Sequence, residues 1–168
     1  MENKDQTRRR LIEQYDKLAE KFNELYREGR DQGRKSMSVA LDKARVQLTE
    51  LGEFSAEHGE ELKKYLARDL DQFIADTRHL GKEAREQFHP SRLGAGALAS
   101  LADVLESTGN ALHSLGEKTK QTLTYKTGEL TSAGTLTCRA CGQKMHLKKT
   151  GHIPPCSKCS GTVFNKGY

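Results

Sequence analysis

Residues 138–161, CRACGQKMHLKKTGHIPPCSKCSG, decide the fold because they contain all 4 cysteines of this 168-residue chain. The cysteines form two C-x-x-C pairs that 14 residues separate. Each pair lets a tight turn aim two sulfurs at one point, and two such turns complete a tetrahedron around a borderline-soft metal ion. The predicted metal ligands are Cys138, Cys141, Cys156 and Cys159.

The residues around the cysteines predict a small β-structure, a zinc ribbon over residues 131–168. Gly142 follows Cys141 directly, where the backbone of such a turn needs a positive φ. Gly161 is expected to serve the second turn in the same way, one residue late, after Ser160. The alternating segments TLTC, KMHLK and TVFN predict short strands.

Other readings of the four cysteines have less support. Two disulfides need an oxidising compartment, and the start MENKDQTRRR has no apolar signal region. A thioredoxin-type pair needs a βαβ setting, which this tail lacks. A rubredoxin-like iron centre uses the same turns, but Phe164 and Tyr168 are the sole nearby aromatics, so zinc is favoured over iron. His146 and His152 are interpreted as surface or supporting residues because four cysteines already fill the ligand shell.

Nothing in the sequence indicates catalysis. A catalytic zinc usually keeps three protein ligands and an open position, whereas four thiolates leave none. The chain also contains no H-E-x-x-H, P-loop or G-x-S-x-G motif. We therefore expect a structural zinc ion, no small-molecule substrate and no enzyme.

Composition favours elongated helical packing over a thick globular core, since 30% of residues are charged, 6% are aromatic and mean hydropathy is -0.78. No apolar run is long enough to cross a membrane. Cysteines at metal spacing, with no signal peptide, predict a cytoplasmic protein.

Charge is uneven along the chain. Residues 1–90 carry 18 basic and 19 acidic side chains, whereas residues 91–168 carry 10 and 4. The tail from Thr131 has no acid, although a zinc ion with four thiolates would add a net charge of about -2 there. The tail residues that we consider for phosphate contacts are Arg139, Lys144, Lys148, Lys149 and Lys158.

Apolar residues at spacings of three and four predict three amphipathic helices within residues 1–90. Their stripes are Leu11, Tyr15, Leu18, Phe22 and Leu25; then Met37, Leu41, Ala44, Leu48 and Leu51; then Leu62, Leu66, Leu70, Phe73, Thr77 and Leu80. The first helix is expected over residues 6–34, and the third follows an N-cap at Ser55 and stops near His89, before Pro90. Arg68 and Asp69 are interpreted as solvated charges on the third helix, with specificity at an interface as the alternative.

Residues 91–130 predict a further helix and a linker, with Leu98, Leu101, Leu105, Leu112 and Leu115 at near-heptad spacing. The expected fold is therefore mainly α, an elongated, coiled-coil-like helical hairpin or bundle with a small C-terminal β zinc ribbon.

Four segments of the chain resemble the YbeL-like family of bacterial zinc-ribbon-containing proteins. They are YDKLAEKFNEL, ELKKYLARDLDQF, GELTSAGTLTCRACGQ and HIPPCSKCSGTVF. The resemblance implies a helical N-terminal region and a C-terminal zinc ribbon, with the four cysteines at the family's metal positions. Ser157 and Ser160 depart from it, since they stand where the family usually has Pro and Gly. The resemblance implies no activity, because the family is functionally uncharacterised.

Two functional hypotheses follow. The first is a zinc-binding interaction or adaptor protein, in which the helical stripes mediate association with a protein partner or a second copy and the ribbon is a rigid docking module. The alternative is a nucleic-acid-associated factor of the ribosome or transcription machinery that contacts phosphates through the basic ribbon.

Overall fold

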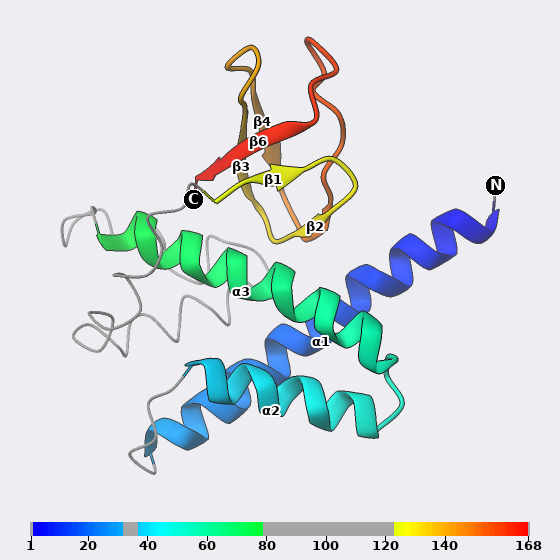
Figure 1. Ribbon diagram of the computed structural model, residues 1–168, viewed down its shortest axis with the longest axis vertical. Helices are drawn as coiled ribbons and strands as arrows, with labels where there is room; N and C mark the ends of the chain where they lie inside the picture. The colour runs from blue at the N-terminus through cyan, green and yellow to red at the C-terminus, as the bar shows by residue number, and fades with distance from the viewer. Residues whose placement is uncertain (1, 32–36, 79–122, 168) are drawn as a thin grey trace.

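The computed structural model describes residues 2–31, 37–78 and 123–167 (Figure 1). Within these ranges three helices form a helical body, and six short strands form a ribbon that lies against α3 on the side opposite α2. The expected class, mainly α with a C-terminal zinc ribbon, is confirmed. The domain boundaries expected at residues 90 and 130 stay predictions. The further helix expected in residues 91–130, and the expected stop near His89, lie outside the described residues.

The helices follow the apolar stripes closely. They are α1 (Glu2–Asp31), α2 (Met37–Glu50) and α3 (Ala56–Arg78). The Ser55 hydroxyl accepts a hydrogen bond from the backbone N–H of His58 at 3.3 Å, which satisfies one of the free donors at the start of α3. Glu57 in the first turn faces the positive end of the helix dipole. The prediction that Ser55 caps the third helix is confirmed.

The stripes of the three helices pack against one another as one core. The core contains side chains that are at most 1% exposed: Tyr15, Leu18 and Phe22 of α1, and Leu62 and Leu66 of α3. The buried members from α2 are Met37, Ala40, Leu41, Ala44 and Leu48. Because these side chains are enclosed within the chain, they are not free surfaces for a partner in this conformation. Of the predicted stripe residues, Leu51 is instead 74% exposed, and Leu80 lies outside the described residues. The large apolar side chains exposed within the described residues are Val39, Val46 and Leu51.

The ribbon consists of two antiparallel sheets. The larger has the order β1-β6-β3-β4, and the smaller pairs β2 with β5. The strands are β1 (Tyr125–Lys126), β2 (Leu130–Thr131), β3 (Gly134–Cys138), β4 (Lys144–Leu147), β5 (Gly151–His152) and β6 (Val163–Gly167). The three strands predicted from alternation are β3, β4 and β6. The other three have two residues each, too few to show a period.

A buried polar junction joins the ribbon to the helical body. Asp69 of α3 and Lys166 of β6 are both completely buried, with Nζ 3.6 Å from Oδ2. Tyr15 donates to Asp69 at 2.6 Å, and the Ser132 N–H donates at 2.7 Å. Thr131 donates to the Asp69 carboxylate at 3.0 Å and accepts from Lys166 at 2.8 Å. The interpretation of Asp69 as a solvated charge is therefore wrong, because the ribbon covers it.

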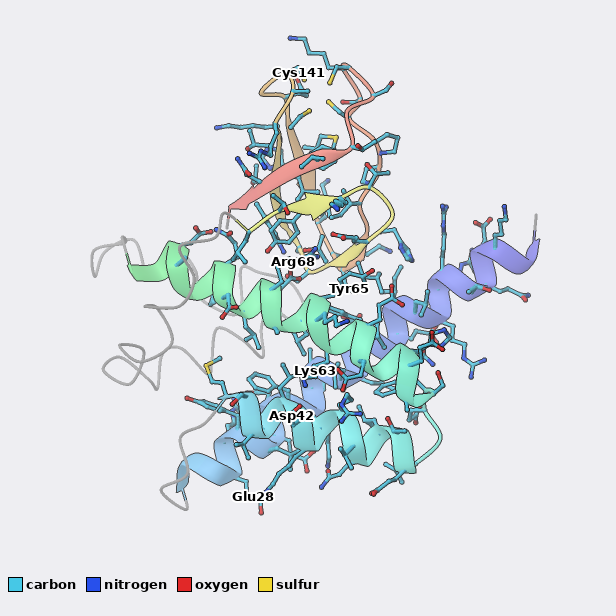
Figure 2. The ribbon with its side chains drawn as sticks, viewed as in Figure 1. Glu28, Asp42, Lys63, Tyr65, Arg68 and Cys141 are labelled. Carbon is cyan, nitrogen blue, oxygen red and sulfur yellow. The ribbon has the colours of Figure 1, made fainter. Side chains whose placement is uncertain are left out.

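Arg68 extends this junction and is also largely covered. Its guanidinium forms an ion pair with Glu129 and donates to the Leu130 carbonyl at 2.9 Å. It also lies 4.0 Å from the ring centroid of Tyr125, within the range of a cation–π contact. Figure 2 shows Arg68 at the boundary between α3 and the ribbon. Its interpretation as a solvated charge is wrong for the same reason.

Burial lowers the pKa of Lys166 to about 8, although the neighbouring Asp69 carboxylate raises it. The lysine is therefore still mainly protonated at neutral pH. Its ammonium donates to the Thr131 hydroxyl, the Ser132 carbonyl and the Ser132 hydroxyl at 2.8–2.9 Å. These partners replace the water that the buried charge has lost.

No helix within the described residues combines the length and the apolar character that crossing a bilayer requires.

We predict that Asp69→Asn lowers the free energy of unfolding by about 3–5 kcal/mol, because it leaves the Lys166 charge buried without its counter-ion. Urea unfolding followed by circular dichroism measures the change. The matched control is Asp42→Asn, which removes an ion pair with Lys63 in which the Asp42 side chain is 51% exposed. The control should cost less than about 1 kcal/mol. Equal costs for the two variants would contradict a structural role for the junction.

Candidate metal centre

The two C-x-x-C turns have the same backbone pattern. In the first, the Gly142 N–H donates to the Cys138 carbonyl and the Cys138 N–H donates to the Gln143 carbonyl, at 2.9 and 2.8 Å. In the second, the N–H groups of Ser160 and Cys156 make the equivalent bonds to Cys156 and Gly161, both at 2.9 Å. Each turn is closed internally, so its two sulfurs point to the same side. β3 leads into the first turn, and β6 leaves the second.

The four sulfurs form one compact group, with every pair within 4.8 Å. Two of the pairs join one turn to the other: Cys138 to Cys159 and Cys141 to Cys156, both at 3.6 Å. A zinc ion with Zn–S bonds of about 2.3 Å needs a tetrahedron whose edges are about 3.8 Å. The donor set and its dimensions therefore fit zinc. Cys138 and Cys156 are buried, whereas Cys159 is exposed.

Electrostatics within the group also favour a cation. The N–H groups of Cys159 and Lys158 hold the pKa of the Cys156 thiol at about 6, well below its ordinary value. Hydrogen bonding to Cys141 instead raises the pKa of Cys159 to about 12. Thiols this close compete for protons because neighbouring thiolates repel one another. A divalent cation resolves the conflict, since the thiolate is the form that binds metal.

Ser160 and Gly161 have different roles from those expected. Ser160 has a φ of 58°, so it occupies the left-handed position that Gly142 occupies in the first turn with a φ of 71°. Gly161 is required for space instead, because a Cβ there would lie 3.1 Å from the sulfurs of both Cys138 and Cys159. The expectation that Gly161 supplies the positive φ is wrong, and its missing side chain lets the backbone approach the metal site.

Neither histidine belongs to the sulfur group. His146 is exposed on β4, and its Nδ1 lies 3.0 Å from the Thr135 hydroxyl. His152 is half-buried in β5, with Nδ1 2.8 Å from the Gly128 carbonyl. Among the described residues, the group of candidate ligands contains the four cysteines alone.

The five basic residues considered for phosphate contacts are all exposed. Arg139 and Lys158 lie inside the two C-x-x-C turns, beside the sulfurs. Lys144 begins β4, and Lys148 and Lys149 follow its end. The structure thus separates them into two groups: two next to the metal centre and three along β4.

A further group of charged residues in the ribbon, centred on Lys166 and Glu129, was not predicted from the sequence. Both side chains face the helical body, where they meet Asp69 and Arg68. A weak signal is present, since Lys166 lies two residues after the buried Phe164 on a strand and therefore shares its face.

Comparison with known proteins agrees with this geometry. Residues 24–167 match the family described as the zinc-ribbon containing domain, and the chain belongs to that family. Curated relatives include Uncharacterized protein YbeL of Escherichia coli strain K12 and of Escherichia coli O157:H7. Each is 21% identical over 157 residues, which cover 94% of this chain and 96% of the relative. No solved structure matches the chain.

We predict that Ser160→Gly raises the melting temperature of the zinc-loaded protein, because it removes a left-handed non-glycine residue at a cost of roughly 1 kcal/mol. Gly161→Ala should have the opposite effect and weaken metal retention, since its methyl group would crowd two sulfurs. Thermal unfolding and zinc competition with a chromophoric chelator measure both effects. Ser157→Gly, in the same turn but without a positive φ, is the matched control for Ser160→Gly. A stabilisation by Ser157→Gly as large as that by Ser160→Gly would contradict the assignment.

Proposed function

We propose that this chain is a non-enzymatic, cytoplasmic zinc-binding interaction protein, in which the helical body holds the zinc ribbon as a rigid docking module. The observation that carries the proposal is the buried junction between Asp69 and Lys166, which attaches the ribbon to α3. The cysteine end of the ribbon, marked by Cys141 in Figure 2, points away from the helices. A surface that is already ordered loses little conformational freedom on binding, which suits a docking role.

A structural role for the metal supports the absence of catalysis in this proposal. In the proposed holoprotein the four sulfurs occupy every position of a tetrahedral ion and leave no site for water or substrate. The zinc ion would supply folding energy to a ribbon whose own core is small. That core consists of Tyr125, Leu136, Cys138, Ile153, Cys156 and Phe164.

The position of the apolar side chains favours the ribbon over the helical stripes as the docking surface. Tyr15, Phe22 and Leu66 are fully buried within the chain, so association through the stripes would require the helical body to open. The ribbon instead presents exposed side chains along β4 and both turns. The alternative function, contact with nucleic acid, uses this same module and is supported by its exposed lysines.

We predict that protein purified under reducing conditions contains about one zinc ion per chain, which native mass spectrometry measures. Cys156→Ser should lose the ion and unfold the ribbon while helix content stays largely intact, because the helical body supplies all the buried residues of its core except Leu130. Far-UV circular dichroism and amide hydrogen exchange separate the two outcomes. A parallel loss of helical signal would show that body and ribbon fold as one unit.

The docking role is tested by affinity purification from the native host, with wild type and Cys156→Ser compared with and without nuclease. Material recovered stoichiometrically with wild type and lost with the cysteine variant supports docking through the ribbon. Asp42→Asn is the control for a substitution that leaves the ribbon unchanged, because Asp42 and its ion-pair partner Lys63 both lie in the helical body. It should recover the same material as wild type. Equal recovery with wild type and Cys156→Ser would overturn the proposal.

A further inference from the structure

We infer that the solvent face of the large ribbon sheet binds the phosphate backbone of a nucleic-acid duplex. This inference rests on the proposed function, because it names the partner class of the docking module. We call the surface the cationic face and define it by Lys126, Lys144, Lys148, Lys149, Thr137 and Asn165.

Strand register places four of these side chains, Lys126, Thr137, Lys144 and Asn165, on one side of the sheet. Asn165 pairs with Thr137, and Thr137 pairs with Lys144, so the three form a row across β6, β3 and β4. Residues paired across strands point to the same face, and successive residues alternate. Phe164, next to Asn165, is fully buried on the opposite side. The row therefore faces solvent.

Lysines stand at both edges of this row. Lys126 pairs with Val163, which lies two residues before Asn165 and shares its face, so it marks the β1 edge. Lys144 marks the β4 edge, and the exposed Lys148 and Lys149 continue beyond it. Four strands span about 14 Å, a width similar to that of a nucleic-acid groove. The uncharged donors Thr137 and Asn165 lie between the two edges and suit phosphate and sugar oxygens.

The ammonium groups on this face form no ion pair among the described residues, although the carboxylate of Glu129 accepts from the Lys126 backbone N–H and that of Asp16 from the Thr150 hydroxyl. Lysines of the helical body form ion pairs, as Lys17 does with Glu53 at 2.6 Å and Lys63 with Asp42 at 2.5 Å. Residues 130–168 contain no acid at all, and the last acid before them, Glu129, pairs with Arg68. Within the described residues, no ion pair is recorded for the lysines of the cationic face.

The metal centre does not neutralise these lysines either. A zinc ion with four thiolates carries a net charge of about -2. Arg139 and Lys158 lie within the two C-x-x-C turns, where their two positive charges balance it locally. The positive charge of the cationic face is therefore not used to neutralise the metal centre. A polyanion is the partner whose charge complements it.

The side chains on this face favour a duplex over a protein or an unpaired strand. Protein interfaces usually centre on buried aromatic or arginine anchors, and unpaired bases stack on aromatic rings. Lys126, Asn165, Thr137 and Lys144 provide neither. Lysine on an edge strand also discourages unwanted strand pairing, which accounts for a charge at the β1 and β4 edges. Edge protection does not explain why residues 130–168 contain no acid, whereas a polyanionic partner does.

The test compares the zinc-loaded full chain with a charge-reversed variant, Lys144→Glu with Lys148→Glu and Lys149→Glu, which keeps the β4 edge charged. Fluorescence anisotropy measures binding to an RNA duplex and to a DNA duplex of the same sequence. If the three lysines contact phosphates, these contacts alone lower the association constant of wild type about 40-fold when salt rises from about 50 to 200 mM. The variant should bind more weakly than wild type at low salt, and its association constant should fall less steeply as salt rises.

The matched control reverses three exposed charges of the helical body, Arg9→Glu with Lys43→Glu and Lys64→Glu, and so changes net charge equally. Zinc content and melting temperature confirm that each variant is folded. We expect the control to bind at least one duplex nearly as well as wild type. Equal losses in the two variants, or no binding of either duplex by wild type, would overturn the inference. If wild type binds no duplex but keeps a ribbon-dependent protein partner, this inference fails while the proposed docking function stands.

Discussion

The structure depends on one buried ion pair, Asp69 with Lys166, which joins a helix to a strand nearly 100 residues later in the chain. Removing both charges from water is costly, and the cost is recovered only when hydrogen bonds satisfy the remaining atoms. Tyr15, Thr131 and Ser132 provide those bonds. A small shift of the ribbon on α3 would leave either charge unsatisfied. The pair therefore selects one orientation of the ribbon, beyond any stability that it adds.

This constraint is linked to the metal centre through β6. The strand follows the second C-x-x-C turn, where Gly161 passes close to two sulfurs, and it places Lys166 seven residues after Cys159. A metal ion bound to the four sulfurs would order this turn and so position the lysine that reaches Asp69. In the other direction, the ion pair between Lys166 and Asp69 anchors the end of β6 on the helical body. The metal centre and the helix contact stabilise one strand from its two ends.

The ribbon divides its cations among three tasks according to their place in the fold. Lys166 points inward and forms the ion pair with Asp69, whereas Arg139 and Lys158 lie beside the sulfurs. The lysines of the cationic face have no such internal role. Counting basic residues along the tail treats all of these as one group, and the sheet register separates them. The same separation explains why a modest net charge can coexist with a strongly cationic surface.

The sequence alone determined the features that local physics controls. C-x-x-C spacing brings two sulfurs together within a single turn, and apolar residues at spacings of three and four specify each helix, so the cluster of four sulfurs and α1 to α3 were predictable. The tertiary structure alone decided the environment of Asp69 and Arg68, whose partners lie about 60 to 100 residues away. It also decided the two-residue strands β1, β2 and β5, which exist because a neighbouring strand pairs with them. Whether a charged residue on a helix is solvated depends on whether a distant part of the chain covers it. The residue pattern within the helix contains no information about that contact.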